Sequence, residues 1–477
     1  MKNDKYIESV KFIESLLNNP GPNFLQESST TDRSFFIKRL KYLLKLLGNP
    51  EKFFKYIHVA GTSGKSSLTA MLQSILTESG IKTGAYFSPH PTTTIERIKT
   101  GENYISPSNF AKLTDYLKPY LSECAAKSPH GAPSYFETLL ALALLYFKQK
   151  KCEYVVLETG LGGAFDATNV IPKPEIAVIT NIDLDHTDIL GKTKTKIAKD
   201  KAGIIKKGST FITGEQDPKI LKIFKKICKN KKSKFQKIDL NYEVLKNDIT
   251  GTKFRYQDNT CQTKLPGEHQ IKNAILAIEA VRELASSCQR LQKIHGISPL
   301  ARRCALNQRF SVQGCGSSLG RDDIGHGLRK AFLPCRLEII QHHPTVILDG
   351  AHNPDKMKTT AEFIKNIKPS RLHLIIALAE NKDLHNTLKY IVPLASRVYL
   401  TRFLIPGRKS QDLKKMHQSA RKLTKNKVSV YIDPWQALDQ ALRNTRKNDI
   451  VLVTGSFFLA GELRKYWMSE DKMLSSN

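Results

Sequence analysis

Short apolar runs alternate with stretches of helical periodicity through the first half of the chain. Five runs have the length and composition of buried strands: 56–60, 83–87, 154–158, 176–180 and 211–213. Apolar positions at helical spacing precede the first run, in FIKRLKYLLKLLGNP, and recur over residues 135–150. Strands that alternate with helices in this way predict an α/β domain built on a doubly wound, mostly parallel sheet.

A second α/β pattern begins near residue 336. Its apolar runs predict strands at 345–348, 373–377, 398–400, 428–432 and 450–454, with helical patterns between them. This set is typical of a smaller, Rossmann-like C-terminal α/β domain. The predicted organisation is therefore a domain over 1–287, a linker over 288–334 and a second domain over 335–477.

The linker differs in composition from the rest of the chain. Residues 282–336 contain eight arginines and two lysines, although lysine is far commoner elsewhere, and four of the eight cysteines lie there. The stretch CALNQRFSVQGCGSSLGRDD has no clean period, which indicates an inserted, poorly ordered or aberrantly translated segment. A metal site formed by Cys288, Cys304, Cys315 and Cys335 is the alternative, although their spacing is unlike that of paired metal ligands.

Composition excludes two classes of protein. The 477 residues include no pair of cysteines in C-x-x-C spacing, so reduced thiols in a cytoplasm are expected rather than a disulfide scaffold. The longest apolar run, 138–147, is about half of a membrane-spanning helix, and the amino terminus lacks the apolar core of a secretory signal. The net charge of +31 favours polyanionic partners, either nucleic acid or phosphorylated and polycarboxylate substrates, unless the lysines simply form solvated faces.

The first candidate for chemistry is a glycine loop between a strand and a helix, GTSGKSS at 61–67. Backbone N–H groups at a helix amino terminus bind phosphate, and Lys65 adds a mobile positive charge. Ser66 and Ser67 offer hydroxyls to phosphate or Mg²⁺. The loop departs from the strict phosphate-loop pattern because Val59 occupies the position of its first glycine.

Two further motifs follow predicted strands of the same sheet. Glu158 ends one strand, at the edge where open α/β sheets bind ligands, and is a candidate Mg²⁺ ligand or a cap of the following turn. Gly162 and Gly163 follow it and allow close approach of a ligand, or serve a turn. His186 lies among aspartates in DHTDILG, beyond the next strand, where we expect it close to a metal. Lys201 falls near the start of a lysine-rich helix.

The second domain carries LDGAHNP at 348–354, directly after a predicted strand. This motif places Asp349, His352 and Asn353 on a glycine turn. We expect these side chains to contact a nucleotide or an amino acid at the cleft between the domains, or to cap the following helix.

Taken together, these strings resemble the folylpolyglutamate synthase/dihydrofolate synthase family, the folate branch of the Mur ligase superfamily. The matching strings occur in the family's order and cover residues 40–465 apart from the atypical segment. They are HVAGTSGKSS, YFSPH, ERIKTGENYIS, ETGLGGAFDATNV, DHTDILG, KAGIIKKG, LPGEHQIKNA, LPCRLE, LDGAHNP and VTGSFFLAGE.

The resemblance implies roles for individual residues. Those implied to bind ATP are Gly61, Thr62, Ser63, Gly64, Lys65, Ser66, Ser67, Asn273, Arg336 and Asp349. Those implied to hold Mg²⁺, with two ions expected, are Ser88, Glu158 and His186. Lys201 matches a lysine that family members carboxylate on its side-chain nitrogen. Those implied to bind the substrate are Gly162, Gly163, His352 and Ser456, and Lys65, Lys201 and His352 are the implied catalytic residues.

The resemblance also implies a reaction. ATP phosphorylates a carboxylate of the pteroyl substrate, and the amine of L-glutamate displaces phosphate from the acyl phosphate to form an amide. It implies a cytoplasmic monomer whose partners are small-molecule substrates, with no membrane or nucleic acid. A Mur-type peptide ligase acting on another acceptor, a basic phosphate-loop protein that binds nucleic acid, and an inactive relative are the alternatives.

Two of the departures from the family's pattern bear on the expected ATP site. The phosphate loop reads SGKSS where the family commonly has Asn-Gly-Lys-Gly-Ser. Cys335 stands where the family usually has glycine, beside Arg336. If the backbone there needs a positive φ, cysteine costs about 1 kcal/mol or more.

Overall fold

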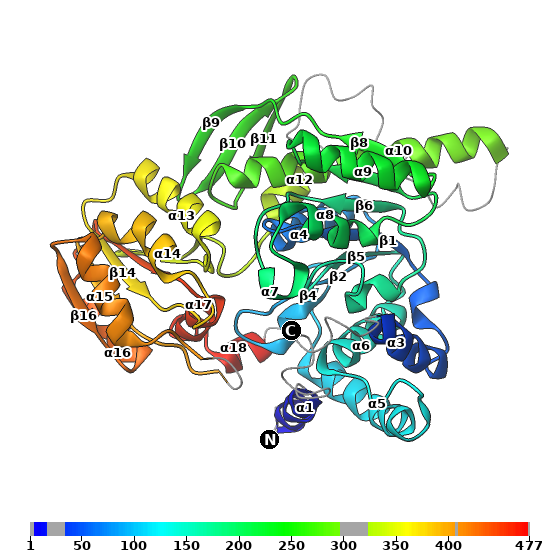
Figure 1. The fold of residues 1–477 in the computed structure, drawn as a ribbon, viewed down its shortest axis with the longest axis horizontal. Helices are drawn as coiled ribbons and strands as arrows, with labels where there is room; N and C mark the ends of the chain where they lie inside the picture. The colour runs from blue at the N-terminus through cyan, green and yellow to red at the C-terminus, as the bar shows by residue number, and fades with distance from the viewer. Residues whose placement is uncertain (1–3, 17–33, 296–322, 406–408, 476–477) are drawn as a thin grey trace.

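The computed structural model of the chain describes residues 4–16, 34–295, 323–405 and 409–475, and shows a large N-terminal part beside a smaller C-terminal part (Figure 1). The predicted α/β class is confirmed, with one large, parallel-rich sheet in the first part and a second sheet in the other. The atypical segment of the linker lies mostly outside the described residues. Among those described, no helix is both long and apolar enough to cross a bilayer.

The large sheet has eight strands in the order β4-β3-β2-β5-β1-β6-β7-β8. They are β1 (Lys55–Ala60), β2 (Thr83–Tyr86), β3 (Ile98–Thr100), β4 (Asn103–Tyr104), β5 (Tyr154–Glu158), β6 (Ile176–Ile179), β7 (Thr210–Thr213) and β8 (Lys234–Lys237). The five predicted strands agree with the structure to within one residue at each end. Neighbours from β2 to β8 run parallel, whereas β3 and β4 extend the β2 edge as antiparallel strands.

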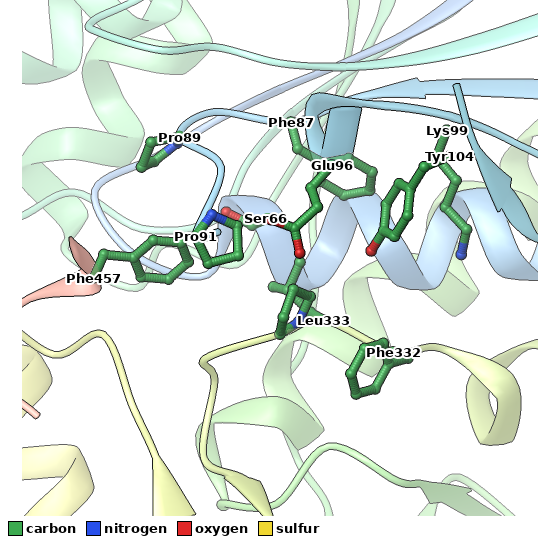
Figure 2. A pocket seen from close by; sticks show the side chains of 11 residues that line it. Ser66, Phe87, Pro89, Pro91, Glu96, Lys99, Tyr104, Phe332, Leu333 and Phe457 are labelled. Atoms are coloured by element: carbon green, nitrogen blue, oxygen red, sulfur yellow. The ribbon is translucent and has the colours of Figure 1, made fainter. Parts of the chain in front are cut away.

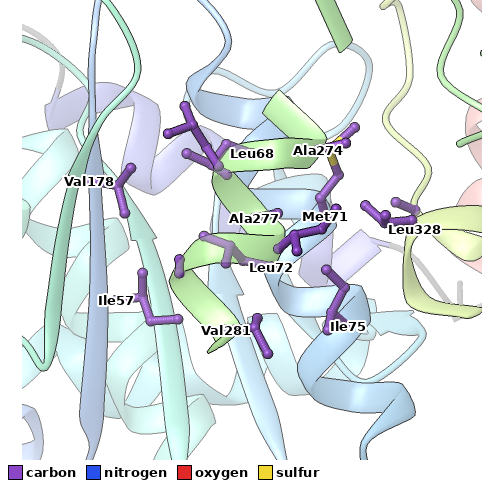
Figure 3. Packing of buried hydrophobic residues seen from close by; sticks show 14 of the residues in the cluster. Ile57, Leu68, Met71, Leu72, Ile75, Val178, Ala274, Ala277, Val281 and Leu328 are labelled. Carbon is purple, nitrogen blue, oxygen red and sulfur yellow. The ribbon is translucent and has the colours of Figure 1, made fainter. Parts of the chain in front are cut away.

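Helices cover both faces of this sheet, because its central strands carry apolar residues on both faces. Ile57 of β1 and Val178 of β6 face a cluster in which α4, α10 and α12 pack together (Figure 3). Tyr56 of β1 faces the opposite cluster, formed by α1, α3, α5 and α6. The helices of this part are α1 (Asp4–Ser15), α3 (Ser34–Leu46), α4 (Lys65–Glu78), α5 (Pro107–Lys127), α6 (Tyr135–Gln149), α7 (Thr187–Leu190), α8 (Lys194–Lys201), α9 (Pro218–Asn230), α10 (His269–His295) and α12 (Asp323–Lys330).

A three-stranded antiparallel sheet lies beyond β8 and was not predicted. It consists of β9 (Glu243–Asp248), β10 (Gly251–Tyr256) and β11 (Asn259–Thr263). Most positions in these strands are polar or charged, and β9 is exposed over its first four residues. No apolar run therefore marks them in the sequence.

The C-terminal part contains a six-stranded sheet in the order β12-β13-β17-β14-β15-β16, antiparallel only at β12. Its strands are β12 (Glu338–His342), β13 (Thr345–Leu348), β14 (Leu372–Ile376), β15 (Arg397–Leu400), β16 (Lys427–Val430) and β17 (Ile450–Thr454). Its helices are α13 (Pro354–Ile367), α14 (Leu384–Ile391), α15 (Leu413–Leu423), α16 (Pro434–Asn444), α17 (Phe457–Arg464) and α18 (Glu470–Ser475). The five predicted strands are present, and β12 adds an edge that the sequence pattern did not indicate.

The two parts meet tightly where α17 lies against the loop after β2. A Cβ atom at Gly461 would fall 1.8 Å from the carbonyl oxygen of Pro91, so only glycine allows this approach. Arg464 donates from Nε to both carboxylate oxygens of Glu338, at 3.0 Å, and its Nη1 lies 3.6 Å from Glu96 of the N-terminal part. The remaining cavity here is about 10 Å³, the size of one water molecule (Figure 2).

Candidate active site

The glycine loop lies at the centre of the large sheet, between β1 and α4. Gly61 and Gly64 have φ values of +145° and +81°. A Cβ atom at Gly61 would lie 1.8 Å from Thr180 Oγ1, and one at Gly64 would lie 2.4 Å from Asn273 Oδ1. Glycine is therefore required at both positions, and the loop leads directly into the amino terminus of α4, where backbone N–H groups attract anions.

Two lysines converge on this loop from different elements. Lys65 Nζ donates to the carbonyl oxygen of Gly61 at 3.0 Å, and Lys201 Nζ donates to the same oxygen at 2.8 Å. Burial, reinforced by the charge of Lys65, lowers the pKa of Lys201 to about 7. At neutral pH a large share of Lys201 is therefore an uncharged amine.

The structure corrects the predicted position of Lys201 in its helix. Lys201 is the last residue of α8, not one near its start, because α8 begins at Lys194 with Thr193 as its cap. Gly163 lies against this helix end: a Cβ atom there would fall 2.6 Å from the Lys201 carbonyl oxygen. Gly163 N also donates to Asp200 Oδ1 at 2.9 Å. The glycines after β5 thus allow α8 to approach and position Lys201.

Oxygen atoms suited to Mg²⁺ gather at the end of β5. Glu158 Oε1 accepts a hydrogen bond from Ser66 Oγ at 2.7 Å, and Oε2 accepts one from Ser88 N at 3.1 Å. Burial raises the pKa of Glu158, and the charge of Lys65 opposes that shift. A buried carboxylate beside a serine hydroxyl offers oxygen ligands that fit a hard divalent cation.

Protein side chains alone do not complete a metal site in the described ranges, where no three His, Cys, Asp or Glu residues gather into a metal-holding group. His186 lies at the cleft in the left-handed conformation, one residue before α7, and its side chain is 46% exposed. The residues present therefore fit an ion that takes most of its ligands from nucleotide phosphates and water, as Mg²⁺ usually does.

The C-terminal part forms the opposite wall. The Arg336 guanidinium stacks over the Phe457 ring, 4.5 Å from its centroid. Asp349 Oδ2 accepts hydrogen bonds from Thr360 Oγ1 at 2.7 Å and from Ala351 N at 3.1 Å. His352 follows on the same turn, with Nδ1 2.8 Å from the carbonyl oxygen of Gly350. Packing against Phe457 thus holds Arg336 in place, and hydrogen bonds hold the glycine turn.

Both walls line one cavity of about 460 Å³. Predicted site residues that line it are Thr62, Ser63, Gly64, Lys65, Ser66, Ser67, Ser88, Glu158, His186, Asn273, Arg336, Asp349 and His352. Predicted residues that do not line it are Gly61, Gly162, Gly163, Lys201, Asn353 and Ser456. Ser456 caps α17, with Oγ accepting a hydrogen bond from Phe458 N at 3.2 Å.

The sequence analysis did not predict several of the residues that line this cavity. Asn181 holds the phosphate loop, with its Oδ1 accepting from Ser63 N at 3.0 Å and its carbonyl oxygen accepting from Thr62 N. Lys356 projects from α13 toward Asp185, with Nζ 3.7 Å from Oδ2. One signal was available for Lys356: a lysine in the first turn of a helix opposes the helix dipole.

Two family models match different parts of the chain. Residues 59–281 match the Mur ligase middle domain, and residues 335–457 match the Mur ligase, glutamate ligase domain. The chain is similar to the dihydrofolate synthase/folylpolyglutamate synthase of Bacillus subtilis, with 34% identity over 90% of this chain and 94% of that protein.

Solved structures extend the similarity to nearly the whole chain. The Mycobacterium tuberculosis folylpolyglutamate synthase complexed with ADP has a TM-score of 0.80 and 26% identity, covering 97% of this chain and 99% of that one. The E. coli FolC in complex with DHPP and ADP has a TM-score of 0.71 and 26% identity, covering 95% and 97% respectively.

Proposed function

Because the chain belongs to the dihydrofolate synthase/folylpolyglutamate synthase family, we propose that it is an ATP-dependent ligase that joins L-glutamate to a folate, to dihydropteroate, or to both. The observation that carries this proposal is the shared cavity, with the phosphate loop on one wall and the glycine turn after β13 on the other. Residues 1–287 would supply the ATP-binding part and residues 335–477 the glutamate ligase part.

The phosphate loop accounts for nucleotide binding. Backbone N–H groups at the start of α4 and the Lys65 ammonium bind the phosphates, and Arg336, Asp349 and Asn273 line the remainder of the nucleotide site. Glu158, Ser88 and His186 would hold Mg²⁺. The ion, when bound, neutralises charge on the phosphoryl group that is transferred.

Lys201 has the properties needed for modification by CO₂. An uncharged amine attacks the carbon of CO₂, a C–N bond forms, and one proton leaves, so the lysine becomes a carboxylate. The pKa of about 7 keeps much of Lys201 uncharged at neutral pH, and its hydrogen bond to Gly61 places it beside the phosphate loop, where the new carboxylate would serve a second Mg²⁺.

The reaction then requires the two walls to act together. Transfer of the γ-phosphoryl group to the pteroyl carboxylate gives an acyl phosphate near Lys65. His352, on the opposite wall, positions the incoming glutamate so that its amine attacks the acyl carbon. Ser456 caps α17, the helix whose Phe457 packs against Arg336 of this wall. Exclusion of water from this cavity during turnover would protect the acyl phosphate from hydrolysis. Buried thiols at the five cysteines whose side chains the structure describes are consistent with a cytoplasmic location, and we expect a monomer.

The test is ADP release that depends on L-glutamate, measured on the full-length chain with Mg·ATP and with dihydropteroate, tetrahydrofolate or no acceptor. Stimulation by either pterin supports the proposal and identifies the acceptor. Lys65→Ala should lower kcat about a hundredfold or more, because it removes a charge that stabilises the transition state. Lys207→Ala, at an exposed lysine outside the site, is the matched control. A folded chain that neither pterin stimulates would contradict the proposal.

A further inference from the structure

Lys356 occupies a position that both helix electrostatics and burial disfavour. Asn353 caps α13, with its Oδ1 accepting from Lys356 N at 2.9 Å, so Lys356 lies in the first turn of the helix. The positive end of the helix dipole repels a cation there. Its side chain is only 17% exposed and lines the large cavity, so solvent does little to offset that repulsion.

Several cations lie near Lys356, whose ion-pair partner is Asp185 and whose neighbour in the first turn of α13 is Asp355. Asp185 provides an ion pair at 3.7 Å, but Lys382 shares the same carboxylate, with its Nζ 3.6 Å from Oδ1. Arg336 and Lys65 add further positive charge within electrostatic range. Both ion-pair distances exceed the 2.7–2.9 Å of a direct charged hydrogen bond. Burial first, and these cations with it, lower the pKa of Lys356 to about 7.

His352 fixes the direction of the Lys356 side chain. A carbonyl oxygen can only accept, so the 2.8 Å contact with Gly350 places the ring proton of His352 on Nδ1. His352 Nε2 is then an acceptor, and it lies 3.2 Å from Lys356 Nζ. The amino group is therefore held at the cavity wall opposite the phosphate loop, with hydrogen atoms left to donate.

The ligand that fits this arrangement is a carboxylate. Lys356 and Lys382 both attract the Asp185 carboxylate, but at 3.7 and 3.6 Å neither makes a direct charged hydrogen bond to it, so donors of Lys356 remain for a second carboxylate in the cavity. We propose that Lys356 binds a carboxylate of the incoming glutamate and so holds the amino acid on the C-terminal wall while its amine faces the acyl phosphate. This inference rests on the function proposed above.

The experiment compares Lys356→Met, Lys356→Arg and Lys358→Met with the unmodified full-length enzyme. Lys358 is on the same helix, with a side chain 58% exposed, and serves as the matched control. KM for glutamate, KM for ATP and kcat are measured with the active pterin acceptor. We expect Lys356→Met to raise KM for glutamate about ten- to a hundredfold, the effect of losing one charged hydrogen bond. KM for ATP should stay within about twofold of its original value.

Lys356→Arg should recover part of that loss, because it restores the positive charge, and Lys358→Met should change nothing. A rise in KM for ATP instead would assign Lys356 to the phosphates and overturn the inference, as would an unchanged KM for glutamate. No turnover by the unmodified enzyme with either pterin would overturn the proposed function, and this inference with it. The two failures are therefore distinguishable.

Discussion

Arg464 and Lys201 are both buried cations, yet their surroundings shift their pKa values in opposite directions. Burial alone would lower the pKa of Arg464, but Glu338 and Glu96 raise it above its ordinary value. Lys201 has a backbone carbonyl oxygen as its hydrogen-bond acceptor and Lys65 as a neighbour, so its pKa falls to about 7. Arg464 pairs with Glu338 and with Glu96 of the N-terminal part, and so joins the two parts of the molecule. Lys201 donates to a neutral carbonyl oxygen instead, and it is the lysine that we propose to be modified.

Removing Arg464, the cation that is paired with carboxylates, should have the largest effect on stability. Arg464→Met would leave two carboxylates, Glu96 and Glu338, buried without their partner. We expect the free energy of unfolding to fall by about 3–5 kcal/mol, the usual effect of removing one member of a buried ion pair. Urea denaturation followed by circular dichroism measures this.

The adjacent residue is the matched control for that change. Lys465 forms ion pairs with Glu462 at 3.0 Å and Glu470 at 3.7 Å, but its side chain is 30% exposed. Lys465→Met should therefore cost no more than about 1 kcal/mol. Equal losses in the two variants would show that burial of the Arg464 cluster has no special effect.

The lowered pKa of Lys201 should make the free energy of unfolding depend on pH. Lys201 has a pKa of about 7 in the folded chain, and a free lysine has about 10.4. Between these values the unfolded chain binds one more proton than the folded chain, so stability rises with pH. Lys201→Met should remove up to about 1.4 kcal/mol per pH unit from that slope, measured in carbonate-free buffer from pH 7 to 10.

The pKa of Lys356 is also lowered, so Lys356 contributes to the pH dependence of stability as well. Because Lys356 is present in both the unmodified chain and Lys201→Met, the difference between their slopes of stability against pH reports on Lys201 alone. An identical slope in Lys201→Met would mean that Lys201 stays protonated in the folded chain. That result would also remove the chemical basis for its reaction with CO₂.

The sequence was most informative where one physical requirement dominated. Apolar runs located the ten predicted strands because parallel strands are buried on both faces and must be apolar. The phosphate loop was identifiable because Gly61 and Gly64 lie where a Cβ atom would clash. By contrast, β9–β11 carry mostly polar side chains, and Lys356 becomes notable only once the fold brings Asp185 and Lys382 around it. Contacts between distant segments leave no local pattern.

The smallest expected effect on stability comes from substitution of Cys335, which lies beside the ion pairs of Arg464 with Glu338 and Glu96. Its backbone N donates to Glu338 Oε2 at 2.9 Å, and its φ of +56° confirms the left-handed backbone that the sequence left conditional. At such a position glycine is favoured over alanine by about 1 kcal/mol, whereas at negative φ in regular structure alanine is favoured by 0.5–1 kcal/mol.

Comparing Cys335→Gly with Cys335→Ala therefore separates backbone strain from packing, because both variants lose the buried sulfur. We expect the glycine variant to be the more stable of the two by about 1 kcal/mol in urea denaturation. A more stable alanine variant would mean that the backbone relaxes away from positive φ. In that case the Cys335 N–H would no longer donate to Glu338. The position of the neighbouring Arg336 at the cavity would then not depend on the ion pairs of Arg464 with Glu338 and Glu96.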